Sequence, residues 1–226
     1  MRVLLVDHDE VTVRSIRNTM RAANMCLDTC TEGTECLDMI RHYDYDAIIL
    51  GATLADISGL DLVRKLRNTS VHVPLLFLAD VDAETRVAAL NNGADDCISR
   101  RLHPDELIGR IKALVRRSRG YANPVITIGT ITLNLSAKTV ETDGRRIRLT
   151  DMEYRILELL LLRRGVAVTR ETFISHLYGD EDGPESRTIE LFVCKLRKKL
   201  SQATGGDSFI ETIRQHGYLL RHVRAA

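Results

Sequence analysis

The chain has 226 residues, with 32 Lys or Arg against 31 Asp or Glu, so its formal net charge is only +1. This length favours one or two domains of roughly 100 to 200 residues each. No stretch reaches the roughly 18 consecutive apolar residues that a membrane span needs, and the acidic start MRVLLVDHDE is unlike a signal peptide. These features exclude a membrane protein and predict a cytoplasmic location.

The cysteines give no sign of a covalent or metal framework. They are odd in number and contain no Cys-x-x-Cys pair, which argues against disulfides and against a zinc site. We therefore expect reduced, packed thiols, no metal and no cofactor. The five positions are Cys26, Cys30, Cys36, Cys97 and Cys194.

The small net charge hides an asymmetry along the chain. Residues 1–119 carry 16 basic and 18 acidic groups, whereas residues 120–226 carry 16 basic and 13 acidic groups. The excess is concentrated between Arg187 and Lys199, where five basic residues accompany the single acid Glu190. This segment is where we expect a polyanion to bind.

The first half alternates short apolar runs with segments of helical period, which predicts a parallel, doubly wound α/β sheet. In such sheets the chemistry lies beyond the carboxyl ends of the strands, here Asp7–Glu10, Gly51–Thr53, Ala79–Asp80 and Arg100–Arg101. The expected strands are 2–6, 25–31, 47–50, 74–78 and 97–99, and the expected helices are near 10–22, 33–42, 58–68, 82–92 and 104–118.

The second half predicts a different architecture. Strand-like pieces at 125–135, 138–142 and 145–149 follow a short linker at 120–124, with a turn at Asp143–Gly144. Thr150 and Glu153 form a capping-box pattern that opens a helix over 152–162, and further helices are expected over 169–177 and 185–202. A closing hairpin over 210–213 and 217–220 completes a winged helix-turn-helix.

At this point the sequence resembles a two-component response regulator of the OmpR/PhoB class. The strings RTIELFVCKLRKKL at 187–200 and IETIRQHGY at 210–218 are similar to the recognition helix and wing of that class. Within the class, CKLRKKL at 194–200, HLYG at 176–179 and AKTVE at 137–141 are most similar to the CtrA branch of cell-cycle regulators, whereas Arg214 departs from the pattern of that branch. The resemblance implies a receiver-like (CheY/flavodoxin-like) domain over 1–119, a linker over 120–124 and a winged-helix domain over 125–226.

The chain departs from the family's receiver at the positions that carry phosphoryl chemistry. The register of the third strand places Gly51 where the family has its phosphoacceptor Asp. The acidic pair that holds Mg²⁺ reads Asp7–His8, the hydroxyl residue falls on Ala79, the Lys-Pro pair on Arg100–Arg101 and the switch aromatic on Cys97. Phosphoryl transfer requires an acceptor, a metal and a placed cation, so their joint alteration predicts a receiver without an aspartyl-phosphate switch.

The charged residues left in this pocket are expected to pair with each other. Asp7 or Asp9 can contact Arg100, as an exposed ion pair of about 0 to 1 kcal/mol. His8 is expected to be a surface histidine and not a metal ligand. Asp56 is expected to precede or cap the helix at Ser58 and not to replace the phosphoacceptor.

The resemblance also implies a dimer interface formed by the fourth helix, fifth strand and fifth helix. Two ion pairs match the family, Arg86 with Glu106 and Asp96 with Arg110, whereas a third is lost because Asn91 stands opposite Lys112. Such pairs contribute roughly 0.2 to 1 kcal/mol each, so the apolar patch must supply much of a micromolar affinity. The expected interface residues are Arg86, Val87, Leu90, Asp96, Glu106, Ile108 and Arg110.

For the second domain, the resemblance implies that the third helix enters the major groove and that the wing contacts the backbone or minor groove. Helical spacing assigns Ile189, Val193 and Leu196 to its buried face. Cys194 can meet a thymine methyl group. The expected DNA-binding residues are Arg187, Thr188, Cys194, Lys195, Arg197, Lys198, Thr212 and Arg214.

The sequence thus predicts a transcription regulator that binds double-stranded DNA at tandem half-sites, independently of phosphorylation, as a homodimer in the bacterial cytoplasm and nucleoid. RNA polymerase or a paralogous regulator is a further expected partner. The alternative is an antagonist that pairs its receiver with a paralogue or adaptor. An enzyme is not expected, because Gly51 cannot accept a phosphoryl group.

Overall fold

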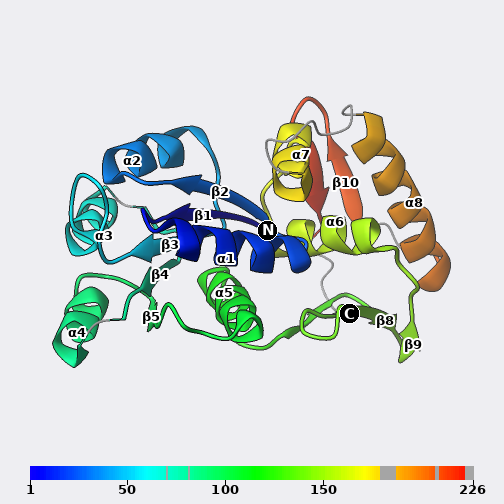
Figure 1. Ribbon diagram of the computed structural model, residues 1–226. Helices are drawn as coiled ribbons and strands as arrows, with labels where there is room; N and C mark the ends of the chain where they lie inside the picture. Colours follow the sequence, from blue (N-terminus) through cyan, green and yellow to red (C-terminus); the bar gives the residue numbers. More distant parts are fainter. Residues whose placement is uncertain (70, 81, 179–186, 207–208, 222–226) are drawn as a thin grey trace. The chain divides into compact units, whose positions relative to one another are not determined.

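The computed structural model describes residues 1–69, 71–80, 82–178, 187–206 and 209–221. The chain divides into two compact units, Met1–Ser118 and Arg119–Ala226, which are considered separately (Figure 1). No helix in the described ranges is both long enough and apolar enough to cross a membrane.

The first unit is a five-stranded parallel sheet in the order β2-β1-β3-β4-β5. Its strands are β1 (Arg2–Val6), β2 (Cys26–Cys30), β3 (Ala47–Gly51), β4 (Leu75–Leu78) and β5 (Asp96–Ile98). Every residue of β1, β3 and β4 is buried, as expected for central strands covered on both faces. The predicted doubly wound α/β fold is confirmed.

Five helices cover this sheet in two groups. The helices are α1 (Glu10–Ala22), α2 (Gly33–His42), α3 (Gly59–Asn68), α4 (Ala83–Asn91) and α5 (Pro104–Ser118). Helices α1 and α5 pack together, and α3 packs against both α2 and α4 (Figure 1). This arrangement leaves the carboxyl ends of β1, β3, β4 and β5 together at one edge, where the candidate site lies.

The second unit begins with a four-stranded antiparallel sheet in the order β6-β7-β8-β9. Its strands are β6 (Val125–Ile128), β7 (Ile131–Asn134), β8 (Thr139–Thr142) and β9 (Arg145–Arg146). The expected turn is present, with Asp143 and Gly144 at φ 47° and 71°, as a two-residue hairpin turn requires. The strand expected over 145–149 is only two residues long, because the chain turns toward the cap of the next helix at Thr150.

Three helices and a hairpin complete the second unit. Helix α6 (Asp151–Leu162) opens with the expected capping box, in which Thr150 N donates to Glu153 Oε2 at 2.8 Å. It is followed by α7 (Arg170–Tyr178), α8 (Arg187–Ala203), β10 (Ile210–Ile213) and β11 (Gly217–Leu220). Residues 185 and 186, where the third helix was expected to begin, lie outside the described residues.

Candidate functional site

The edge of the first sheet brings together three residues from different strands. Asp7 follows β1, Gly51 ends β3 and Arg100 lies two residues beyond β5. A Cβ atom at position 51 would lie 2.5 Å from Asp7 Oδ2 and 3.2 Å from Arg100 Nη2. Because real Cβ atoms essentially never come closer than 3.0 Å to another heavy atom, the space beside Gly51 is already filled.

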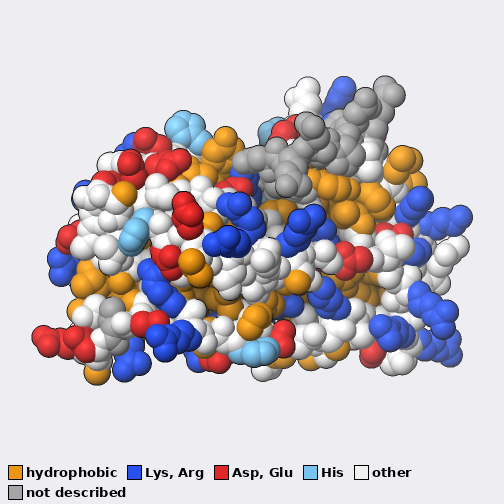
Figure 2. Space-filling model, in the orientation of Figure 1, with side chains coloured by type: hydrophobic (Ala, Val, Ile, Leu, Met, Phe, Trp, Pro, Cys, Tyr) orange, Lys and Arg blue, Asp and Glu red, His pale blue; other side chains and the backbone are white. Residues whose placement is uncertain are grey.

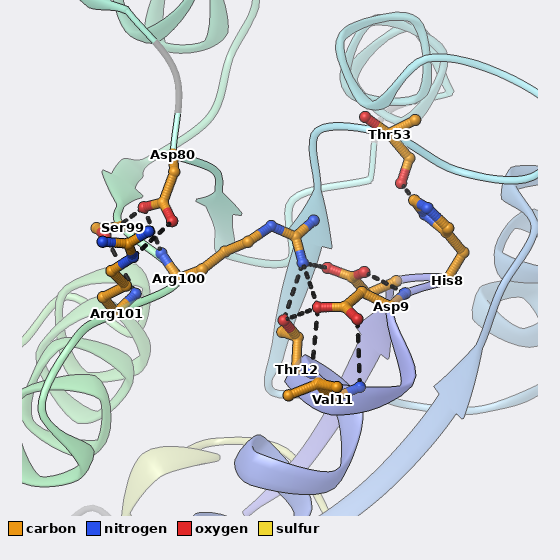
Figure 3. Close-up of polar contacts among 10 residues, drawn as sticks. His8, Asp9, Val11, Thr12, Thr53, Asp80, Ser99, Arg100 and Arg101 are labelled. Atoms are coloured by element: carbon orange, nitrogen blue, oxygen red, sulfur yellow. Dashed lines mark hydrogen bonds and ion pairs between the residues drawn. The ribbon is translucent and has the colours of Figure 1, made fainter.

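The Arg100 side chain crosses the pocket to reach the residues after β1 (Figure 3). Its Nη1 atom lies 2.8 Å from Asp7 Oδ2 and 3.7 Å from Asp9 Oδ2, and it donates to Thr12 Oγ1 at 3.1 Å. The Thr12 hydroxyl in turn donates to Asp9 Oδ2 at 2.5 Å and is the largest cause of a lowered pKa at Asp9. Arg100 therefore occupies the pocket with its charge compensated.

Asp7 is more deeply placed than the sequence indicated. The contact with Arg100 was expected to be exposed, but the Asp7 side chain is 0% exposed and that of Arg100 is 20% exposed. Asp7 Oδ1 accepts a hydrogen bond from Asp9 N at 2.9 Å, while Oδ2 is in ion-pair contact with Arg100 without hydrogen-bond geometry. A buried carboxylate that loses its partner destabilises the fold strongly, so breaking this pair should cost more stability than breaking a surface pair.

The remaining polar groups at this edge are also engaged. His8 is exposed, as expected, and its Nδ1 lies 2.9 Å from the Thr53 carbonyl oxygen (Figure 3). Asp80, after β4, accepts a short hydrogen bond from Ser99 Oγ and one of 3.1 Å from Arg100 N. The Ser99 hydroxyl is the largest cause of a lowered pKa at Asp80.

These residues do not fit the Mg²⁺ ion that the resemblance implies. A hard cation requires several oxygen ligands. Here Asp7 is turned to Arg100, position 8 is a histidine and position 51 has no side chain. In the described ranges, no three His, Cys, Asp or Glu side chains lie close enough together to hold a metal ion.

Two further sequence predictions concern residues near this pocket, Ala79 and Asp56. Ala79 directly follows β4 and is buried, so the position after this strand carries no hydroxyl. Asp56 precedes α3, as one of the two predicted alternatives has it, but it does not cap that helix: Ser58 does, whereas Asp56 accepts hydrogen bonds from the first turn of α2. Asp56 accepts hydrogen bonds from Gly33 N at 2.7 Å and Thr34 N at 3.0 Å, which lower its pKa to about 2.

The residues expected at the dimer interface lie on α4, β5 and α5. Val87 and Leu90 are large apolar side chains that remain 55% and 46% exposed. Arg110 donates within the chain to Asp96 at 2.8 Å and to Glu106 at 2.7 Å. Asp96 and Glu106 were predicted to belong to two different intersubunit pairs. Within one chain, both of them already pair with Arg110.

Helix α8 presents one face to solvent and one to the core of the second unit. Ile189, Val193 and Leu196 are buried, as the spacing predicts. Cys194, Lys195 and Lys198, by contrast, are exposed. Arg187 begins the helix, but its side chain lies outside the described residues.

Not all of the basic residues in this helix face solvent. Lys199 turns inward and pairs with the buried Glu153 of α6 at 2.6 Å. Arg197 donates to Ile210 O at 3.0 Å and to Thr212 Oγ1 at 2.8 Å, and so connects α8 to β10. The exposed basic surface of the helix is therefore smaller than the count of five basic residues suggests.

One residue of this surface was missed by the sequence analysis. Leu191 is 62% exposed and lies three and four positions before Cys194 and Lys195. The signal was present in the sequence, because Leu191 falls out of phase with the buried stripe of the helix. An exposed leucine beside exposed lysines adds an apolar contact to this face.

Comparisons with known proteins match both units. A family described as "Response regulator receiver domain" matches residues 3–112, and one described as "Transcriptional regulatory protein, C terminal" matches residues 144–220. The cell cycle response regulators CtrA of Brucella anthropi and Brucella ovis are each 46% identical over 98% of this chain and 96% of theirs. The chain belongs to the OmpR/PhoB family of response regulators.

As a member of this family, and of its CtrA type, the chain is a DNA-binding transcription regulator and not an enzyme. Among solved structures, response regulator DrrB, an OmpR/PhoB homologue from Thermotoga maritima, is 23% identical and has a TM-score of 0.46. That similarity covers 97% of this chain and 98% of DrrB.

Proposed function

We propose that this response regulator binds DNA and regulates transcription without aspartyl phosphorylation, and that its receiver serves for dimerisation or for input from a ligand or partner. The observation that carries the proposal is the contact of Arg100 with Asp7 beside Gly51. A Cβ at position 51 would meet Asp7 Oδ2 at 2.5 Å, so the pocket as it stands has no room for an acceptor side chain.

The chemistry of phosphoryl transfer supports the same proposal. The transferring group spreads negative charge over its oxygens, and catalysis consists of placing a metal and cations around them. Here the nearest carboxylate and the nearest cation neutralise each other at 2.8 Å. An incoming phosphodonor would have to break this pair, and Gly51 offers no side-chain oxygen to accept its phosphoryl group.

The receiver-like domain, over 1–119, is proposed to dimerise through its α4-β5-α5 face. Exposed Val87 and Leu90 provide an apolar centre, with Ile108 half-buried beside the ion-paired Arg110. Arg86 and Glu106 complete the charged surroundings. To form the intersubunit ion pairs, Arg110 would have to give up its contacts with Asp96 and Glu106 of its own chain.

The winged-helix domain, over 125–226, is proposed to read tandem half-sites on double-stranded DNA through α8. Lys195 and Lys198 are exposed for base-edge or phosphate contacts, and Cys194 for a thymine methyl group. Arg187 and Thr188 lie at the start of the helix, whereas Thr212 and exposed Arg214 lie on the wing. Arg197 is also a proposed DNA contact, and its hydrogen bond to Thr212 Oγ1 fixes the position of Thr212. The proposed setting is the bacterial nucleoid, with RNA polymerase or a paralogous regulator as a further partner.

The test is DNA binding by the purified, untreated protein. Sites selected from a random duplex library should be bound without any phosphodonor, and the footprint should show two direct half-sites. An antagonist would bind DNA only together with a paralogue. In cells, chromatin immunoprecipitation beside that paralogue separates the two functions, because a regulator has peaks of its own whereas an antagonist has none.

A further inference from the structure

We infer that the β8–β9 hairpin is a second phosphate-binding surface, which holds the DNA backbone next to the stretch that α8 reads. The surface, called here the basic edge, consists of Lys138, Arg145, Arg146 and Arg148. All four side chains are exposed. The inference deepens the DNA-binding function and rests on the docking of α8 proposed above.

The basic edge carries charge that the fold leaves uncompensated. Within the described part of the chain, none of its four side chains takes part in a hydrogen bond or an ion pair. Glu141 stands opposite Arg146 in the strand register, and Asp143 in the turn is the one other acid between positions 138 and 148, so the four cations outnumber the acids of the hairpin by two. Clustered cations without internal partners attract a polyanion.

The local fold presents these side chains outward. Asp143 and Gly144 make a tight turn, and β9 is the outer strand of its sheet. Ile147 is buried and its N–H donates to Val140 O at 2.7 Å, which fixes the segment against β8. Because side chains alternate along an extended chain, Arg146 and Arg148 then project on the side away from Ile147.

The basic edge lies at the carboxyl-terminal end of α8. Arg148 is two residues before the cap of α6, and Glu153 in the first turn of α6 contacts Lys199 of α8 at 2.6 Å. Exposed Lys198 belongs to the same end of α8, and exposed Lys195 lies at the middle of the helix. In Figure 2, Lys and Arg side chains gather over this part of α8 and over β9, while Figure 1 shows the β10–β11 turn toward the other end of α8.

A duplex docked on the outer face of α8 would therefore be held on two sides. The wing contacts the backbone on one side, and the basic edge contacts phosphates on the other. Such contacts position the protein without reading sequence. They add to affinity and to its salt dependence, by about −0.9 in the log–log slope for each phosphate neutralised.

The experiment uses the full-length variant Arg145→Gln/Arg146→Gln/Arg148→Gln and fluorescence anisotropy on a selected single half-site and on the tandem site, between 50 and 200 mM salt. The expected slope is about 2 to 3 smaller in magnitude than that of the wild type, with affinity weakened at least tenfold and sequence preference unchanged. A matched variant, Arg14→Gln/Arg21→Gln/Lys65→Gln, removes three exposed charges from the receiver and should keep the wild-type slope.

Three outcomes would overturn the inference. Equal slope losses in both variants would mean that only overall charge matters. A loss confined to tandem sites would mean that the basic edge binds the neighbouring subunit, and an unchanged slope with aggregation would mean that it only protects a sheet edge. Lys195→Ala is measured in parallel as a separate test of the docking of α8. If this variant binds DNA as tightly as the wild type, the docking itself is contradicted, whatever slope the basic-edge variant shows.

Discussion

Gly51 and Arg100 act on the same small volume, and the sequence revealed only part of their relationship. The missing carboxylate at position 51 follows from the strand register, because β3 is an unbroken apolar run whose end can be read directly. The burial of Asp7 does not follow from the sequence, since it depends on the reach of Arg100 across from β5. Leu191 is the opposite case, because its helical phase would have been sufficient to predict its exposure although that prediction was missed.

The ion pair of Asp7 and Arg100 allows us to predict how much stability is lost when Arg100 is replaced. Arg100→Ala should lower the free energy of unfolding of the first unit by about 1 to 3 kcal/mol, because a buried carboxylate loses its partner but keeps one N–H donor. Arg101→Ala is the matched control; its side chain is 91% exposed, and the expected change is within about 0.5 kcal/mol. Urea-dependent hydrogen exchange of β1 amides measures both, and equal effects would contradict the proposed role of Arg100.

A second residue-scale prediction concerns restoration of the acceptor. Gly51→Asp alone should not be phosphorylated by acetyl phosphate, because its Cβ would lie 2.5 Å from Asp7 Oδ2 and the other pocket positions remain altered. Mass spectrometry of the treated variant measures the result. Robust phosphorylation of this single variant would show that His8, Ala79 and Arg100 do not disable the pocket.

Among the secondary-structure elements, local signals predicted most boundaries, and the misses have long-range causes. The capping box of α6 lies within four consecutive residues and was read correctly. The cap of α2 comes from Asp56, more than 20 residues along the chain, so only the folded structure could identify it. The same holds for Lys199, which a count of basic residues assigned to the surface but which pairs with Glu153.

The cap of α2 predicts a pH dependence. Hydrogen bonds from the Gly33 backbone and its neighbours lower the pKa of Asp56 to about 2. A carboxylate with a depressed pKa stabilises the fold above its ordinary pKa, and this stabilisation is lost as the pH falls through about 2. Asp56→Asn should therefore melt below the wild type at pH 7, and the difference should shrink below about pH 4. A difference independent of pH would mean that the charge of Asp56 has no part in the cap.

Replacing the exposed lysines of α8, Lys195 and Lys198, is expected to affect DNA binding in two different ways. Lys198→Ala, if it removes a phosphate contact, should weaken binding to all sequences alike and reduce the salt slope by about one. Lys195→Ala, if it removes a base-edge contact, should cost about 1 to 3 kcal/mol and relax the preference at one position. Anisotropy titrations on the selected site and its point variants separate the two effects, and indifference to both substitutions would contradict the docking of this helix.

For the whole molecule, the connection between the two units bears on how two copies meet DNA. A short linker was predicted over 120–124, and within it the Tyr121 hydroxyl donates to Leu161 O at 3.3 Å. The segment between the end of α5 and this anchor comprises only Arg119 and Gly120. Residue composition pointed to the linker, whereas its attachment to α6 depends on tertiary packing. We still expect tandem half-sites about one helical turn, roughly 10 to 11 base pairs, apart.

At this scale we expect a homodimer that forms without phosphorylation. Asp96→Arg should raise the monomer fraction, because it breaks a charge pair of the α4-β5-α5 face, and adding Arg110→Asp should restore part of the dimer. Sedimentation equilibrium measures both. Val87→Asn/Leu90→Asn, which removes the apolar centre, should have the larger effect. If the Asp96 variant is as dimeric as the wild type, the dimer uses another surface.

The main proposal is that this protein binds DNA without aspartyl phosphorylation of its receiver, and a single titration can test it. The purified wild-type protein is titrated onto its selected DNA site before and after treatment with acetyl phosphate and Mg²⁺, and its intact mass is recorded in parallel. We expect an unchanged mass and an unchanged dissociation constant. A covalent phosphate on any Asp of the first 119 residues, together with tighter DNA binding, would contradict it.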